Sequence, residues 1–215
     1  MQRQELNTAA TLSFSKLACS RGGRQLFQGV NCELESGRWL YVAGANGVGK
    51  TSLLRMVCGL STIESGQILW NRIPIGAQRE SYCRDLCYLG HLNALQESMT
   101  VSENLTFTAA LAGLAPPASR KQAVLAQFGM SGRDDQLVRH LSQGQKRRVA
   151  LSRLALSSAR LWVLDEPFVA MDEAGVRMLA DLIASHLGAG GLAVLTSHQH
   201  VKIGAVAPQL LELRA

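Results

Sequence analysis

At 215 residues, 47% hydrophobic and 18% charged, the chain has the composition of a globular protein and the length for one well-buried domain. No apolar run approaches the roughly 20 residues that span a bilayer, and residues 1–8 lack the apolar core of a signal peptide, so we expect any membrane role to depend on a partner. The net charge of +6 would suit nucleic acid or anionic lipid, but the basic triplet at 146–148 has no interleaved aromatics, and no nucleic acid is expected.

The first 90 residues alternate short apolar runs with turn residues, which predicts strands joined by tight connections. Gly22-Gly23 marks one of these turns. A helix is predicted over residues 50–57, stopped by Gly59. The predicted strands cover residues 11–17, 26–27, 30–34, 39–43, 66–70, 73–75 and 86–89.

The middle of the chain is helical, and the last third returns to alternating strands and helices. Thr100 and Glu103 have the spacing of a capping box at the start of one helix, which Pro116-Pro117 ends. The other predicted helices cover 119–128, 146–156 and 172–186, and the later strands cover 161–164, 192–196 and 210–213.

This alternation predicts an α/β fold, with a mixed sheet that has an antiparallel part and with an inserted helical subdomain. We expect a single domain over residues 1–215. Its core would cover about 1–91 and 160–215, and its helical subdomain about 92–159.

Residues 44–51, Gly-Ala-Asn-Gly-Val-Gly-Lys-Thr, match the phosphate-binding loop pattern of P-loop NTPases between a predicted strand and a predicted helix. Glycines let backbone N–H groups surround phosphate oxygens, and the helix N-terminus adds favourable partial charge. Lys50 would reach the β- and γ-phosphates, and the Thr51 hydroxyl would bind Mg²⁺. The alternative, an ordinary Gly-rich turn, does not account for all four specified positions. The predicted nucleotide-binding residues here are Gly44, Ala45, Asn46, Gly47, Val48, Gly49, Lys50, Thr51 and Ser52.

Two carboxylates follow the predicted strand at 161–164. Asp165 and Glu166 would lie at the carboxyl end of a buried strand, where α/β sheets bind ligands. Neighbouring strand residues point to opposite faces, so Asp165 can hold Mg²⁺ while Glu166 polarises the water that attacks the γ-phosphate. A turn or helix cap is the alternative, and the upstream phosphate loop favours the catalytic interpretation.

A second phosphate contact is predicted where Leu-Ser-Gln-Gly-Gln, residues 141–145, precedes a helix. Ser142 and Gln145 have capping-box spacing, and the N–H groups of a helix N-terminus suit an anion. A plain capping box would explain these two residues but not Gly144 so close to the cap.

Together these motifs resemble, in the same order and over nearly the whole chain, the ATP-binding subunits of ABC transporters. The resemblance implies that Ser142, Gly144 and Gln145 of one copy cap the γ-phosphate held by the other, so that ATP is enclosed in a head-to-tail homodimer. It implies that His198, after the strand at 192–196, contacts the γ-phosphate and that Asp172 lies in the dimer loop. Considered by itself, a histidine after a strand is more often a surface or core residue.

Three residues depart from the common family pattern. Residues 141–145 correspond to the signature of the family. Gln143 stands where the signature usually has glycine, and its bulk affects how closely that loop packs against a partner's nucleotide. Arg21 stands where many relatives have an aromatic residue that stacks on adenine. An arginine plane can also stack, and a solvated turn arginine is the alternative. His91 stands where relatives carry the glutamine of the coupling loop, and we expect it to take that role.

These departures narrow the resemblance. A short subunit with Gly90-His91, Leu-Ser-x-Gly-Gln-x-Arg-Arg at 141–148 and Leu-Asp-Glu-Pro-Phe at 164–168 resembles the ATP-binding subunits of cytochrome c maturation heme exporters. That implies an ATPase requiring ATP and Mg²⁺, peripheral on the cytoplasmic face of the bacterial inner membrane. Its partners would be an integral membrane subunit and heme-handling membrane proteins. Whether heme itself or release of a loaded heme chaperone is driven stays open, because no heme-ligating motif is present in the sequence.

Two alternatives remain. An ABC subunit for another cargo would carry the same motifs. A soluble ABC-type ATPase acting on nucleic acid or ribosomes usually has a long coiled-coil insertion or two ATPase halves. This chain has one phosphate loop, and Lys50 and Ser142 are too close in sequence for such an insertion.

Overall fold

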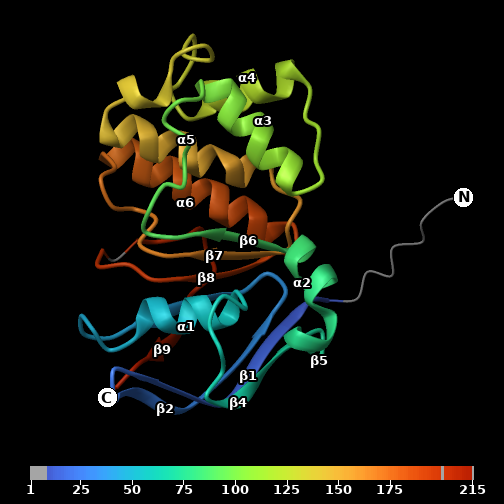
Figure 1. The fold of residues 1–215 in the computed structure, drawn as a ribbon, viewed down its shortest axis with the longest axis vertical. Coiled ribbons are helices and arrows are strands. Elements are labelled where there is room, and N and C mark those ends of the chain that lie inside the picture. Colours follow the sequence, from blue (N-terminus) through green and yellow to red (C-terminus); the bar gives the residue numbers. More distant parts are fainter. Residues whose placement is uncertain (1–8, 200, 215) are drawn as a thin grey trace, which may run out of the picture.

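Two separate sheets organise the fold (Figure 1), which the computed structural model describes for residues 9–199 and 201–214. One sheet is antiparallel, in the order β2-β1-β4-β5, and the other is parallel, in the order β6-β7-β8-β3-β9. The predicted α/β fold with an antiparallel part is therefore confirmed, with the two kinds of strand in separate sheets. The prediction that residues 1–8 are not a signal peptide concerns residues outside the described ranges.

Strands from the first half of the chain contribute to both sheets, and strands from the second half belong to the parallel sheet. Their bounds are β1 (Thr11–Arg21), β2 (Arg24–Glu35), β3 (Trp39–Ala43), β4 (Ser65–Trp70), β5 (Ile73–Pro74), β6 (Leu86–Leu89), β7 (Leu161–Leu164), β8 (Leu192–Leu195) and β9 (Gln209–Glu212).

The helices connect these strands. They are α1 (Lys50–Val57), α2 (Arg79–Asp85), α3 (Val101–Leu111), α4 (Ala118–Gln127), α5 (Gln143–Leu156) and α6 (Glu173–Gly188), with short 3₁₀ turns at Ile75–Gln78 and Val138–His140. No helix in the described ranges has the length and apolar content that crossing a bilayer requires.

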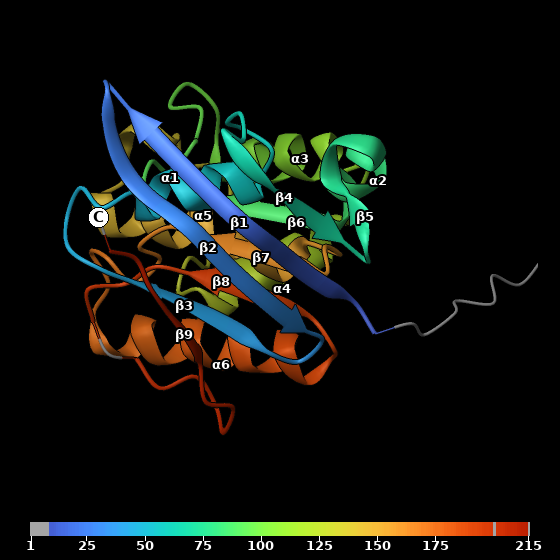
Figure 2. The same ribbon diagram turned by 90° about the horizontal axis from the view of Figure 1, so that it is seen from below.

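The parallel sheet separates two hydrophobic cores. Along β7, Leu161 and Val163 face a core shared with α1 and the antiparallel sheet, whereas Trp162 and Leu164 face a core shared with α3 to α6. Figure 1 shows α1 between the parallel strands and β1/β2, with the other long helices beyond the opposite face, and Figure 2 shows the long β1 and β2 lying over α1. Because β7 is buried on both faces, its four residues are all apolar.

The last strand supports the start of the phosphate loop. β9 pairs in parallel with β3, matching Ala43 to Glu212, and the Leu213 N–H donates to the Ala43 carbonyl at 2.9 Å. A Cβ on Gly44 would lie 2.8 Å from the Leu213 carbonyl oxygen. Position 44 therefore needs glycine, because the backbone after β9 lies directly against it.

The predicted elements agree with the structure in type, with differences at several boundaries. The two short runs predicted at 26–27 and 30–34 form one strand, β2. Helix α5 begins at Gln143, three residues before the predicted start, and α3 ends at Leu111. The sequence pattern did not predict α2, whose one buried residue is Tyr82.

Candidate functional site

The loop between β3 and α1 has the backbone that a phosphate cradle requires. Gly44, Gly47 and Gly49 have φ values of +140°, +79° and +105°. Gly49 is the N-cap of α1, and a Cβ there would lie 3.0 Å from the Phe27 ring. Glycine is needed at 49 because this close packing and the positive φ both oppose a side chain. The first-turn N–H groups of α1 are then free for an anion.

Lys50 lies across this loop. Its ammonium donates to the carbonyl of Gly44 at 2.7 Å and to that of Ala45 at 3.3 Å. The side chain thus returns from the first turn of α1 to the beginning of the loop. The positive charge lies where the loop would enclose phosphate oxygens.

Asp165 joins the phosphate loop to two neighbouring strands. Its Oδ2 accepts a hydrogen bond from the Thr51 hydroxyl at 2.8 Å, and its Oδ1 accepts one from the Thr196 hydroxyl at 2.8 Å. The Asp165 side chain is buried, with 2% of the residue exposed. These paired hydroxyls satisfy both oxygens of a buried carboxylate, which would otherwise be costly to desolvate.

Glu166 is held in an unusual backbone conformation beside this cluster. Its φ is +49°, in a region that residues with a Cβ seldom occupy. Its N–H donates to the Thr196 hydroxyl at 2.9 Å, and its carboxylate accepts from the His198 N–H at 3.2 Å. The His198 ring Nε2 lies 3.4 Å from the other carboxylate oxygen. Strain held by surrounding contacts is common at active sites.

Eleven of the predicted site residues line one cavity of about 440 Å³. It brings the phosphate loop, the two carboxylates and His198 together with Arg21 from the end of β1 and His91 from the loop after β6. Leu26 of β2 also lines it, and no motif in the sequence indicated that residue. The predicted residues in the cavity wall are Arg21, Asn46, Gly47, Gly49, Lys50, Thr51, Ser52, His91, Asp165, Glu166 and His198.

The signature residues and Asp172 lie outside this cavity wall. Ser142 and Gln145 form a capping box at the start of α5, with both reciprocal hydrogen bonds present, and Ser142 is exposed. Asp172 caps α6 and pairs with Arg148 at 2.8 Å. One chain therefore does not bring its own signature to its own phosphate loop.

The donor set of the cavity fits Mg²⁺. The Thr51 hydroxyl and the Asp165 carboxylate are hard oxygen ligands, and they converge beside the Lys50 ammonium. Within the described ranges no cluster of three His, Cys, Asp or Glu side chains could hold a metal. Mg²⁺ binds proteins through one or two oxygens and takes its other ligands from phosphate and water, and Thr51 and Asp165 could supply such a pair of oxygens.

Two supporting residues were not predicted. Thr196 bonds both carboxylate-bearing residues, and its signal was a hydroxyl at the carboxyl end of a predicted strand. Tyr41 of β3 donates from its hydroxyl to the Ser197 carbonyl at 2.6 Å and so holds the segment that carries His198. Burial, and then the charge of Glu166, raise the pKa of Tyr41, so the hydroxyl keeps the proton it donates.

Comparison with known proteins gives concordant matches. The family model described as ABC transporter matches residues 27–169. A cytochrome c biogenesis ATP-binding export protein, CcmA, of Albidiferax ferrireducens is 79% identical over 98% of this chain and 100% of its own length. The protein of the same description from Dechloromonas aromatica is 50% identical over 90% of this chain and 95% of its own.

Solved structures agree on the fold. A structure of the ATP binding subunit of an ABC transporter superposes with a TM-score of 0.84 at 23% identity, covering 94% of this chain and 85% of that one. At this identity the match shows the fold alone.

Proposed function

This chain belongs to the ABC transporter family and, within it, to the cytochrome c biogenesis ATP-binding export proteins, and from that membership we propose that it hydrolyses ATP to drive heme handling. The observation that carries the proposal is the single cavity shared by Lys50, Thr51, Asp165, Glu166 and His198. These side chains supply, at one place, phosphate binding, a metal position and a base.

In the proposed reaction Glu166 orients and polarises the water that attacks the γ-phosphate. Its carboxylate is 12% exposed and lies against His198, so it faces the cavity while its backbone is fixed. Lys50 and the α1 N-terminus neutralise charge on the phosphates, and His198 contacts the γ-phosphate. Mg²⁺, when held by Thr51 and Asp165, would balance the charge that develops on the phosphate oxygens.

We propose further that the working site is composite. The Ser142–Gln145 capping box leaves the start of α5 exposed and outside the cavity of its own chain. A second copy, placed head to tail, would bring that helix N-terminus onto the γ-phosphate. ATP would then hold two copies together, and hydrolysis would release them.

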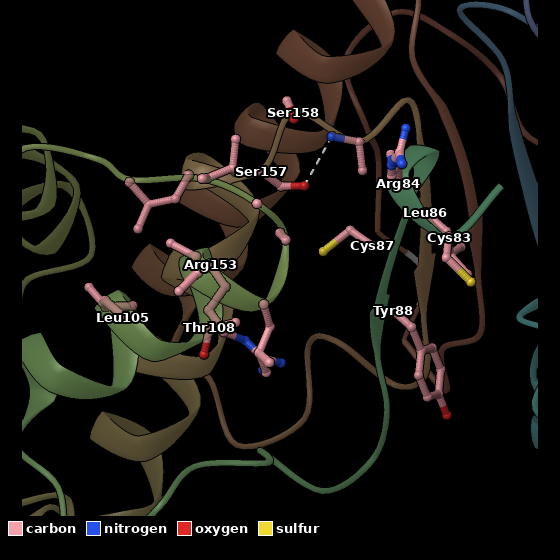
Figure 3. A pocket seen from close by; sticks show the side chains of 18 of the residues that line it. Cys83, Arg84, Leu86, Cys87, Tyr88, Leu105, Thr108, Arg153, Ser157 and Ser158 are labelled. Atoms are coloured by element: carbon pink, nitrogen blue, oxygen red, sulfur yellow. Dashed lines mark hydrogen bonds between the residues drawn. The ribbon is translucent and has the colours of Figure 1, made fainter. Parts of the chain in front are cut away.

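The proposed output of closure is movement of an integral membrane subunit. A groove of about 740 Å³ lies between β6 with α2 on one side and α3 with the end of α5 on the other. Figure 3 shows Leu105, Thr108 and Arg153 on the helical side of this groove and Tyr88 on β6, the strand that leads into His91. Leu111 is 74% exposed at its edge. A segment of the membrane subunit seated here would touch both parts that move during closure.

This arrangement would place the chain peripherally on the cytoplasmic face of the bacterial inner membrane, with heme-handling membrane proteins as neighbours. The assignment of heme as the cargo is supported by the similarity to proteins described as acting in cytochrome c biogenesis. Deletion should abolish c-type cytochromes while leaving other respiratory enzymes intact. A deletion strain with normal c-type cytochromes would contradict a heme role and favour another cargo.

The catalytic part is tested with Glu166→Gln. Removal of a general base typically costs about 10²- to 10⁴-fold in rate, whereas the phosphate contacts of Lys50 and α1 remain. The variant should bind ATP, turn over slowly and accumulate as an ATP-bound dimer in size-exclusion chromatography. A variant that hydrolyses ATP at the wild-type rate would refute the role of Glu166.

A further inference from the structure

Arg147, in the second turn of α5, is a buried cation without a carboxylate partner among the ion pairs of the described residues. The residue is 5% exposed. Its Nη2 donates to the Glu166 carbonyl at 2.8 Å, and its Nη1 donates to the Asn93 side-chain oxygen at 3.3 Å and to the Gly90 carbonyl at 3.4 Å. Burial, and then the charge of Arg153, lower the pKa of Arg147, while the charges of Asp165 and Glu166 oppose that shift. The guanidinium is therefore held beside the site by three neutral oxygens and by the nearby carboxylate charges.

The Glu166 carbonyl is a sensitive place for such a contact. Glu166 has a φ of +49°, and its main chain is held from two directions. Thr196, after β8, receives its N–H, and Arg147, from the helical subdomain, donates to its carbonyl. A small displacement of that carbonyl rotates the peptide and therefore moves the carboxylate on the same residue.

The other two contacts lie on either side of His91. Gly90 precedes it and Asn93 follows two residues later, so Arg147 fixes the loop that leaves β6. The next residue on α5 toward its N-terminus, Lys146, pairs with Glu97 farther along the same segment. The start of α5 and the loop carrying His91 are therefore joined at several points and would move as one unit.

We propose that Arg147 is a positioning residue for ATP hydrolysis: it transmits the position of the helical subdomain and the His91 loop to the backbone of Glu166. This rests on the proposed function, because it presumes that Glu166 acts on the attacking water. Arg147 does not line the nucleotide cavity. It therefore acts through Glu166 and should affect turnover rather than ATP affinity.

The test uses the full chain, purified alone and with its membrane complex, and compares Arg147→Gln and Arg147→Lys with the wild type. A misplacement of a catalytic group by about 1 Å can cost on the order of 100-fold in rate. We expect Arg147→Gln to lower kcat at least about tenfold while the KM for ATP stays within a factor of about two, since the phosphate-loop contacts are untouched. Arg147→Lys should recover part of kcat, because an ammonium can reach one of the three acceptors.

Two further variants separate positioning from folding. Arg120→Gln is the matched control: this exposed arginine of the same subdomain donates to the Ala155 carbonyl at 3.1 Å, away from the cavity. It should leave kcat unchanged. Asn93→Ala removes one half-buried acceptor and should lower kcat less than Arg147→Gln does, which keeps the proposal testable if Arg147→Gln does not fold.

A double variant distinguishes this proposal from the function on which it rests. In the Glu166→Gln background, Arg147→Gln should cause no further loss of rate, because residues that act as a unit are non-additive. An additive loss, an unchanged kcat in Arg147→Gln, or a raised KM at constant kcat would overturn the role of Arg147. If instead Glu166→Gln alone keeps the wild-type rate, the proposed base itself is wrong.

Discussion

Thr51 and Asp165, 114 residues apart in sequence, share a hydrogen bond of 2.8 Å between hydroxyl and carboxylate. The bond joins the first turn of α1 to the end of β7, the element next to the proposed base. It fixes two oxygen ligands at one point before any metal is bound. The proposed Mg²⁺ position is therefore preorganised by the fold. The free-energy cost of bringing the two oxygens together belongs to folding rather than to metal binding.

Thr51→Val should raise the Mg²⁺ concentration needed for half-maximal ATP hydrolysis, because valine keeps the shape of threonine but lacks the ligand oxygen. The loss also leaves Asp165 Oδ2 without this donor, which costs about 1–3 kcal/mol for a buried acceptor. Titration of activity with Mg²⁺ at saturating ATP measures the shift. Thr51→Ser should behave like the wild type, and identical Mg²⁺ curves for valine and threonine would contradict the assignment.

The composite site predicts complementation between two inactive variants. Lys50→Ala should lose phosphate binding, and Ser142→Arg should block the signature contact. In a mixed dimer, one site combines Lys50 of the Ser142→Arg copy with Ser142 of the Lys50→Ala copy. That site is intact, whereas the other site carries both substitutions. Mixing the purified variants should restore part of the ATPase rate. No recovery, in samples where tagged copies are shown to co-purify, would place both residues in the same chain's site.

Tyr41→Phe should slow turnover, since the Ser197 carbonyl then loses the hydroxyl that holds the segment before His198. The stability loss should be about 0.5–1.5 kcal/mol for one hydrogen bond. Tyr82→Phe is a matched control, because Tyr82 also donates to a backbone carbonyl, that of Val57, at 2.6 Å. Urea unfolding should show a similar loss for both variants, while kcat should fall only for Tyr41→Phe. Equal kcat values in the two would contradict this role.

His186 predicts a pH dependence of stability. Its ring stacks on Trp162 with centroids 3.8 Å apart, and burial lowers its pKa from the ordinary value of 6.5, more than the backbone carbonyls of Leu192 and Arg160 raise it. The folded state therefore binds this proton less readily than the unfolded state.

The stabilisation is complete above pH 6.5 and is lost as pH falls through the window below it, by up to about 1.4 kcal/mol per pH unit for one proton. His186→Phe keeps a flat ring without a titrating group and should flatten the curve of unfolding free energy between pH 5 and 7. Parallel curves for variant and wild type would show that His186 does not titrate in this way.

Local signals explain how much of the fold was predictable. Thr100 and Ser142 indicate where their helices begin, because a capping box can be recognised from four consecutive residues. Helix α2 has no such signal: its sequence is polar, its buried residue is Tyr82, and it is fixed by distant contacts such as the Trp70 indole N–H to Asp85 at 2.8 Å. Contacts between elements decide such a helix, and a linear pattern does not contain them.

The candidate site likewise contains residues that local motifs indicate and residues that only contacts between distant segments place. Lys50, Asp165 and Glu166 stand in short motifs whose spacing has a chemical reason, so their proximity could be predicted. Arg147 stood in a basic triplet and in a motif of the family resemblance, and neither assigned it a contact. Its partners Gly90 and Glu166 lie 57 and 19 residues away. Its contacts come from the packing of α5 against the loop after β6 and the segment after β7, which a linear motif cannot indicate.

The pairing of β9 with β3 makes the phosphate loop depend on a distant part of the chain. The strand before the phosphate loop lies between β8 and β9, which follow the loop by more than 100 residues in the sequence. Until Leu213 is available, the Ala43 carbonyl lacks its donor and Gly44 lacks the backbone that packs against it. The nucleotide motif is therefore present in the chain long before the backbone that supports the start of its loop can pack against it.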